Sequence, residues 1–330
     1  MKCSGEPSPP TASVGESSDG DSIAPIDRRG AQTCHGVRKA AQQGIFRSMT
    51  VVKTIADLRA ARARLGVMSF VPTMGALHEG HLSLVQIARQ YARHVAVSIF
   101  VNPTQFGPRE DFTKYPRPIE ADLEMCKQAG VELVFNPEPA EIYRPGTPTI
   151  TIDLPELTQT LEGRHRPGHF QGVCQVVAKL FNLVQPQYAM FGQKDFQQLR
   201  VLEAMADTLD FPIQVVACPT LRDPDGLAMS SRNRYLSPDE RARALSISRA
   251  LFAAEAEAKA GAQVTSKLVA IMQRMLLDPG KLGHVQLTID YVACVDSKTL
   301  KPTDSFDQPV TCAIAARVGM TRLIDNVVIG

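Results

Sequence analysis

The chain changes from strand to helix along Val71-Pro72-Thr73-Met74-Gly75-Ala76-Leu77-His78-Glu79-Gly80-His81. The apolar run 67–71 predicts a strand, and the spacing of apolar residues that follows predicts a helix ending near Arg93. A strand, a glycine-containing turn and a helix bring the free N–H groups of the helix start to the carboxyl end of the strand. The pattern therefore predicts an anion site at this turn.

Two histidines, His78 and His81, lie at the start of this helix. At a spacing of three residues both rings project to the same side, and Gly80 between them would leave room for a ligand to approach closely. One histidine at such a position is most often a helix residue without a function. A pair in this setting favours a functional interpretation. A metal site is less favoured, because no further ligands lie close in sequence.

Two more segments place polar residues after predicted strands. The apolar run 95–101 predicts a buried parallel strand, and Gln105 follows it at a position where open α/β sheets bind ligands, although a loop-capping role is equally consistent with the sequence. Strand 188–191 precedes Gly192-Gln193-Lys194-Asp195-Phe196-Gln197-Gln198. A lysine at a helix start is contrary to the helix dipole, so Lys194 favours a bound anion, with an ordinary surface lysine as the alternative.

Three other segments carry candidate residues of lower specificity. Met229-Ser230-Ser231-Arg232 offers two hydroxyls and an arginine, which suit a mobile loop that binds phosphates. His169 ends a basic, turn-rich stretch before a helix predicted over about 171–183. Asp122, in a helix predicted over 119–129, is open to two interpretations: a magnesium ligand or, more in keeping with the sequence, part of a solvated helix face.

Composition and charge exclude several classes of protein. The chain has 330 residues, 44% of them apolar and 21% charged, and a net charge of +2, which gives no electrostatic case for nucleic acid as a partner. No window approaches the roughly 20 apolar residues of a membrane helix. The seven cysteines are widely spaced and odd in number, which is typical of a reduced cytoplasmic protein.

The remaining pattern divides the chain into three parts. Residues 1–48 are rich in Ser, Gly and Pro and are predicted to be a disordered extension. Residues 49–220 alternate strands and helices, beginning with a helix over 54–65 capped by Thr54 and including strands at 131–135, 149–154 and 213–217. Residues 221–330 are predicted to form a smaller α+β domain, with helices from Ser237 to about 259 and over 265–277, and strands at 287–295, 311–318 and 322–329.

The motif His78-Glu79-Gly80-His81 resembles the His-x-Gly-His signature of the nucleotidyltransferase superfamily. Together with 97–106, the stretch from Pro72 to His81 resembles more specifically the pantothenate synthetase (pantoate–β-alanine ligase) family, and the similarity runs from about Met49 to the C-terminus. Departures from the family pattern are Gln193 for glutamate, Phe196 for tyrosine and Gln175 for threonine.

The resemblance implies a Rossmann-like, doubly wound parallel sheet followed by a C-terminal lid domain. It implies ATP-dependent condensation of pantoate with β-alanine through pantoyl adenylate, with Mg²⁺ as cofactor, in a cytoplasmic homodimer. The catalytic residues would be His78, His81, Lys194 and Arg232, and the pantoate and β-alanine site would include Gln105, Gln198 and His169. ATP would be bound by Met74, Gly75, Ala76, Leu77, His78, Glu79, Gly80, His81, Gly192, Gln193, Lys194, Asp195, Leu221, Met229, Ser230, Ser231 and Arg232.

Two alternatives remain open from the residues alone. One is another nucleotidyltransferase, which would share His-x-Gly-His but gives no evident reason for the pair Gln105 and Gln198. The other is a non-catalytic nucleotide-binding module on the same fold, which fold analogy cannot exclude. The joint presence of Lys194, Arg232 and both histidines argues against the second. The sequence names no protein ligands for Mg²⁺.

Overall fold

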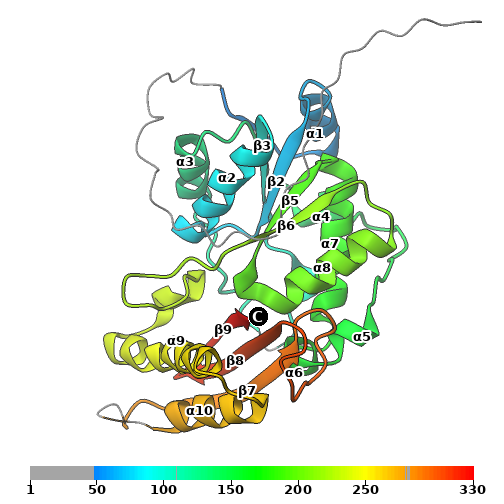
Figure 1. Ribbon diagram of the computed structural model, residues 1–330. Coiled ribbons are helices and arrows are strands. Elements are labelled where there is room, and N and C mark those ends of the chain that lie inside the picture. The colour runs from blue at the N-terminus through cyan, green and yellow to red at the C-terminus, as the bar shows by residue number, and fades with distance from the viewer. Residues whose placement is uncertain (1–47, 109, 279, 281–282) are drawn as a thin grey trace, which may run out of the picture. The chain divides into compact units, whose positions relative to one another are not determined.

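Six apolar segments form a parallel sheet in the computed structural model of the protein, which describes residues 48–108, 110–278, 280 and 283–330 (Figure 1). The sheet order is β1-β4-β3-β2-β5-β6, and every neighbouring pair is parallel. Its strands are β1 (Thr50–Val52), β2 (Met68–Thr73), β3 (His94–Ile99), β4 (Leu133–Phe135), β5 (Tyr188–Gly192) and β6 (Gln214–Cys218).

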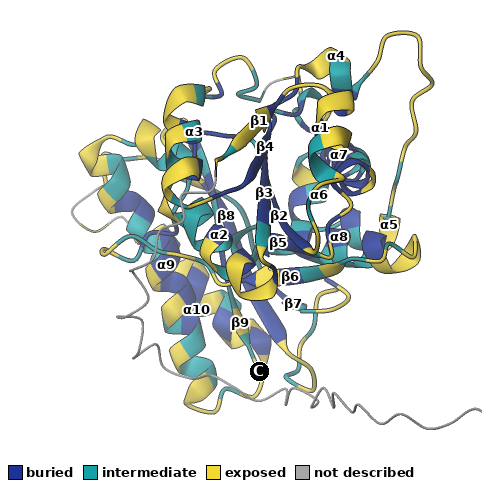
Figure 2. Cartoon of the chain, turned by 90° about the horizontal axis from the view of Figure 1, so that it is seen from above, coloured by how far each residue is buried: buried dark blue, intermediate teal, exposed yellow. Residues whose placement is uncertain are grey.

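Helices cover both faces of this sheet, which explains why its central strands are apolar along their whole length. Successive residues point to opposite faces, so that Phe70 joins one core and Val71 the other. Helices α2 and α3 lie on one side of the sheet and α1, α7 and α8 on the other (Figure 1). Figure 2 shows the resulting pattern of buried strands and helices with exposed outer faces.

The α-helices that precede β6 in the chain are α1 (Ile55–Arg62), α2 (Glu79–Tyr91), α3 (Ile119–Gln128), α4 (Pro139–Ile142), α5 (Pro155–Thr158), α6 (Leu161–His165), α7 (His169–Val184) and α8 (Phe196–Thr208). Three 3₁₀ turns are η1 (Pro103–Gln105), η2 (Gln193–Asp195) and η3 (Ser231–Tyr235). Thr54 caps α1 as predicted, because its side chain accepts a hydrogen bond from the Asp57 N–H.

The strand order reverses at β2, which is the feature that locates the site. From β2 the chain proceeds through β3 to β4 on one side of the sheet and later through β5 to β6 on the other. Ligands of open α/β sheets bind at such a reversal, beyond the carboxyl ends of the strands. The His78 turn follows β2 and the Lys194 turn follows β5, so two segments more than a hundred residues apart meet there.

A second sheet and two helices form the C-terminal part. The helices α9 (Pro238–Lys259) and α10 (Thr265–Leu277) pack on an antiparallel sheet of order β7-β8-β9, made by β7 (Leu287–Asp296), β8 (Val310–Val318) and β9 (Thr321–Ile329). Ser237 and Glu240 form the capping box that the sequence predicts. The fold class predicted from the sequence, a doubly wound parallel sheet with a smaller α+β part, is confirmed.

Some element predictions were wrong in detail. Residues 149–154 pair with no strand of the described chain, and Ile150 in the middle of the segment is 71% exposed, so its alternating pattern has no sheet to face. Strand β2 begins at Met68 because Val67 remains in solvent, and α7 begins at His169, two residues earlier than expected. The prediction of a disordered extension over 1–48 lies, except for residue 48, outside the described residues.

The described residues include no helix that is both long enough and apolar enough to cross a membrane.

Candidate active site

A cleft opens where the strand order reverses, with an empty volume of about 1290 Å³ that includes open solvent. It is lined by most of the residues predicted from the sequence, namely Met74, His78, Gly80, His81, Gln105, Gly192, Lys194, Asp195, Gln198, Leu221, Met229, Ser230, Ser231 and Arg232. The predicted residues outside its lining are Gly75, Ala76, Leu77, Glu79, Gln193 and His169.

The His78 ring caps helix α2 and has a defined proton position. Its Nδ1 accepts a hydrogen bond from the Gly80 N–H at 3.1 Å. A neutral ring that accepts at Nδ1 carries its proton on Nε2, which is therefore a donor. Burial, and then the nearby Lys194, lower the pKa of His78, so the ring is neutral near pH 7.

The His81 ring stacks against His78, with 4.1 Å between ring centroids. Burial, and then the neighbouring His78 and Lys194, lower the pKa of His81 to about 3. Its Nδ1 is buried and has no hydrogen-bond partner among the described residues. An unsatisfied ring nitrogen beside a cleft is typical of a functional site. Both rings are therefore suited to donating hydrogen bonds rather than protons.

The structure gives a reason for glycine at position 80 that differs from the one the sequence indicates. A Cβ at this position would lie 2.8 Å from Cε1 and 2.9 Å from Nδ1 of His78. The absent side chain first makes room for the His78 ring, and only through it for a ligand.

The turn between β2 and α2 is held from another helix by Asp122. The two carboxylate oxygens of Asp122 accept hydrogen bonds from the N–H groups of Ala76 and Leu77, each at 2.8 Å. Gly75 and Ala76 have φ angles of 80° and 51°, so the turn needs this support. Asp122 is 1% exposed, and burial raises its pKa while the two N–H donors oppose that rise. The prediction that Asp122 lies on a solvated helix face was wrong.

These hydrogen bonds also change the expected source of the positive character that would bind an anion at this turn. The N–H groups of Ala76, Leu77 and Gly80 have internal partners, because Asp122 takes two and His78 takes the third. Positive character in the cleft therefore comes from side chains rather than from these three amides.

The two cations of the cleft differ in their surroundings. Lys194 Nζ lies 3.9 Å from Asp195, and the Lys194 side chain is 19% exposed. Arg232 is held by a bidentate ion pair in which Nε and Nη2 donate to Asp111 at 3.1 and 3.0 Å. Burial by itself would raise the pKa of Asp111, but the hydrogen bonds from Arg232 outweigh it and hold that pKa below its usual value. Ser230 caps η3 by accepting from the Arg232 N–H.

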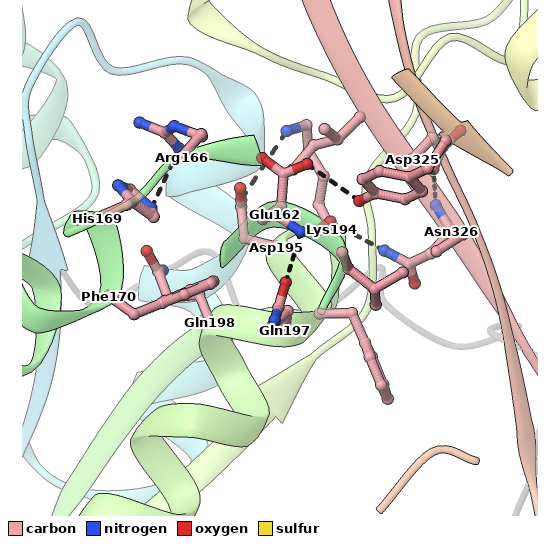
Figure 3. A pocket seen from close by; sticks show the side chains of 15 residues that line it. Glu162, Arg166, His169, Phe170, Lys194, Asp195, Gln197, Gln198, Asp325 and Asn326 are labelled. Atoms are coloured by element: carbon pink, nitrogen blue, oxygen red, sulfur yellow. Dashed lines mark hydrogen bonds and ion pairs between the residues drawn. The ribbon is translucent and has the colours of Figure 1, made fainter. Parts of the chain in front are cut away.

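Gln105, which also lines the cleft, is held by hydrogen bonds to its side chain and its backbone. Asn102 donates to Oε1 of Gln105 at 3.0 Å, which turns the Gln105 amide nitrogen toward Met74 Sδ at 3.2 Å. His169 donates from Nδ1 to the Gln105 carbonyl at 2.8 Å and accepts at Nε2 from Arg166 at 3.1 Å. Both His169 ring nitrogens are therefore occupied within the protein. His169 lines a smaller neighbouring pocket, shown in Figure 3.

Sequence reasoning assigned no role to three residues that shape the cleft, Asn102, Asp111 and Tyr115, and did not predict the turn-holding role of Asp122. Asn102 and Tyr115 line it directly, and the Tyr115 hydroxyl lies 3.5 Å from Ser231 Oγ. Asn102 ends a predicted strand, which was a usable signal. The partners of Asp111 and Asp122 lie 121 and about 46 residues away in sequence, and no local pattern indicates them.

Comparison with known proteins identifies relatives of this chain. Residues 47–328 match the family model described as Pantoate-beta-alanine ligase. A pantothenate synthetase from Acidothermus cellulolyticus is 50% identical over 294 residues, covering 88% of this chain and 94% of that protein.

Two solved structures extend the comparison to three dimensions. Pantothenate synthetase from Thermus thermophilus has a TM-score of 0.79 at 45% identity, over 84% of this chain and 99% of that chain. Pantoate-beta-alanine ligase from Francisella tularensis, complexed with beta-gamma ATP and beta-alanine, has a TM-score of 0.69 at 30% identity, over 85% and 97%. The chain belongs to the pantoate–β-alanine ligase family.

Proposed function

We propose that this chain condenses pantoate with β-alanine at the expense of ATP, forming pantothenate through pantoyl adenylate and releasing AMP and pyrophosphate. The observation that carries the proposal is the composition of one cleft in a member of this family. Four basic side chains, His78, His81, Lys194 and Arg232, line it together with the two amides of Gln105 and Gln198. The Francisella relative was solved with beta-gamma ATP and beta-alanine, which are two of the three proposed substrates.

In the first step a carboxylate oxygen of pantoate attacks the α-phosphorus of ATP and pyrophosphate leaves. Negative charge grows on the leaving group, and groups already aimed at it lower the barrier. His78 would donate from Nε2–H, and Lys194 and Arg232 would supply full positive charge. The low pKa of His81, about 3, supports hydrogen bonding over proton donation by this ring.

Pantoate would be held by the amides of Gln105 and Gln198, which can donate and accept at once. The anchored Oε1 of Gln105 leaves its NH₂ group for a pantoate oxygen, in place of the contact with Met74. His169 would act through Gln105, since its ring nitrogens are both engaged. Its role is thus indirect support of the pantoate site.

In the second step the neutral amine of β-alanine attacks the acyl carbon of the adenylate. The C–N bond forms, the C–O bond to AMP breaks and the amine loses a proton to solvent or to the departing phosphate. Water would hydrolyse the mixed anhydride, so the site has to be covered during this step. Residues 221–330, which carry Met229 to Arg232, would close over the nucleotide as a lid separate from 49–220.

Mg²⁺ would enter with the phosphates of ATP. Among the described residues, no group of three His, Cys, Asp or Glu side chains is arranged to hold a metal ion. Magnesium in nucleotide sites is commonly bound by substrate phosphates, one or two carboxylates and water. Asp195, which lines the cleft beside Lys194, is the carboxylate of this site best suited to that task. When bound, the ion would neutralise phosphate charge.

The experiment that tests the function is pyrophosphate release with ATP, Mg²⁺ and pantoate, first without and then with β-alanine. A single-turnover burst that becomes sustained turnover only with β-alanine is the expected result. Release with a different acceptor alone would favour another nucleotidyltransferase. Nucleotide binding without release for any acceptor would favour a binding module.

The family resemblance further supports a homodimer located in the cytoplasm. Light scattering of the purified protein would test the first, and fractionation of cells would test the second.

A further inference from the structure

Asp325 and Asn326 are two adjacent polar residues buried in strand β9, with exposures of 4% and 6%. A buried polar side chain costs free energy unless its hydrogen bonds are made, and an apolar residue would be the ordinary choice in such a strand. Neither residue lines the main cleft. Their contacts therefore need a reason beyond packing.

Asn326 holds the turn that carries Lys194. Its Nδ2 donates to the backbone carbonyls of Gln193 and Lys194, each at 2.9 Å. Figure 3 shows Asn326 beside Lys194. These residues belong to η2, for which no side chain provides a cap. One amide from the C-terminal sheet thus fixes the backbone from which the Lys194 side chain enters the cleft.

Asp325 holds the segment that leads to Arg232. Its carboxylate accepts two hydrogen bonds from Arg222, at 2.6 and 2.9 Å. Arg222 also donates to the Gly226 carbonyl at 3.2 Å and forms a β-bridge with Ala228, so it closes the turn immediately before Met229. The Asp325 carboxylate and the Asn326 N–H are joined by a further hydrogen bond at 2.8 Å.

We propose that Asp325 and Asn326 are positioning residues, which fix the Lys194 turn and the Met229–Arg232 segment relative to each other so that both cations meet one triphosphate. This inference rests on the proposed function, because it assigns the two cations to ATP. The pair touches neither substrate nor reacting atoms and acts only through the two backbone segments. Displacement of a catalytic group by about 1 Å can lower a rate roughly 100-fold, so such anchoring matters.

The test is Asn326→Leu, which keeps the shape of the side chain and removes both donors. We expect single-turnover adenylation to fall about 10- to 100-fold while the KM for pantoate stays within about twofold. If Asn326 acts through Lys194, the two changes are not additive. In a Lys194→Ala background, Asn326→Leu should then lower the adenylation rate by less than about threefold further.

Tyr291→Phe is the matched control. The Tyr291 hydroxyl donates to Glu162 at 3.0 Å, so it also links the C-terminal sheet to the preceding part of the chain, but at α6 rather than at an ATP segment. This variant should keep the wild-type adenylation rate. Thermal unfolding of all variants separates lost positioning from lost stability.

Several results would overturn the inference. It fails if Asn326→Leu adenylates at the wild-type rate, or if Tyr291→Phe lowers the adenylation rate as much as Asn326→Leu does. It also fails if Asn326→Leu lowers that rate by the same factor in the Lys194→Ala background as in wild type. Should Asn326→Leu not fold, Asn326→Ser, which retains a single donor, replaces it with the same expectations. An inactive wild-type protein would refute the proposed function instead, so the two failures are distinguishable.

Discussion

Replacing Asp122 by asparagine tests whether a buried carboxylate outside the cleft sets the geometry of the histidine pair. The carboxylate accepts two N–H bonds at 2.8 Å, whereas an asparagine side chain has one acceptor oxygen and would turn its NH₂ toward the second N–H. One buried N–H loses its partner and faces another donor. Each such loss costs roughly 1–3 kcal/mol, and the surviving bond is weaker because it is no longer charge-assisted.

We therefore expect Asp122→Asn to lower the free energy of unfolding by about 2–4 kcal/mol. The turn it supports has left-handed residues at Gly75 and Ala76, and α2 with His78 and His81 follows directly. Relaxation of the turn would move both rings, so adenylation should fall about 10- to 100-fold even at temperatures where the variant is folded.

Urea unfolding and single-turnover pyrophosphate release are the two assays. Glu132→Gln is the control, because Glu132 is a buried carboxylate that also accepts a backbone N–H, from Val95 at 2.9 Å, but lies outside the cleft lining. It should lose stability and retain its rate. The reasoning is refuted if Asp122→Asn is as stable and as active as wild type. A variant that regains full activity at high Mg²⁺ would point to the magnesium role instead.

Three further predictions concern histidines and the glycine beside them. His78→Ala and His81→Ala should each lose about 10²–10⁴-fold in the first half-reaction, and less than about fivefold for both would contradict their role. Because burial lowers the pKa of His81 to about 3 and of His169 to about 4, the folded state binds fewer protons than the unfolded state below about pH 6.5, and stability is lost as the pH falls. At pH 5 each ring should cost roughly 2 kcal/mol relative to pH 8, and urea unfolding of His169→Gln should show a weaker pH dependence than that of wild type. Gly80→Ala should displace the His78 ring and slow adenylation without lowering the thermal midpoint, whereas Gly66→Ala, where a Cβ meets nothing within 4 Å, should leave the rate unchanged.

The fold was largely predictable because its signals are local. An unbroken apolar run such as 95–101 requires cover on both faces, and a capping box such as Ser237 with Glu240 marks a helix start. The prediction of a strand at 149–154 was wrong for the complementary reason. Alternation of apolar and polar residues indicates a half-buried strand only when a neighbouring strand is available to pair with it. The sequence does not show whether such a strand is adjacent.

The positions of site residues were predictable where the sheet topology determines which segments lie next to each other. Residues after parallel strands meet at one edge of the sheet, so His78, Gln105 and Lys194 were expected together and do line one cleft. No comparable rule predicts the contacts that support the cleft residues from other elements. Asp122 belongs to a helix whose spacing favours a solvated face, and only the packing of α3 against the turn turns that side chain inward.

The amides of the turn show that the hydrogen bonds available at a motif depend on residues elsewhere in the chain. A helix start beside a strand end offers N–H groups, but Asp122 and His78 take those of Ala76, Leu77 and Gly80 within the protein. These three N–H groups are then not free for a ligand, and the side chains of the cleft depend for their charge and position on distant partners. For Arg232 that partner is Asp111. If Arg232 binds the triphosphate as proposed, Asp111 has to share or give up this ion pair, and affinity then depends on exchange of ion pairs as well as on new contacts.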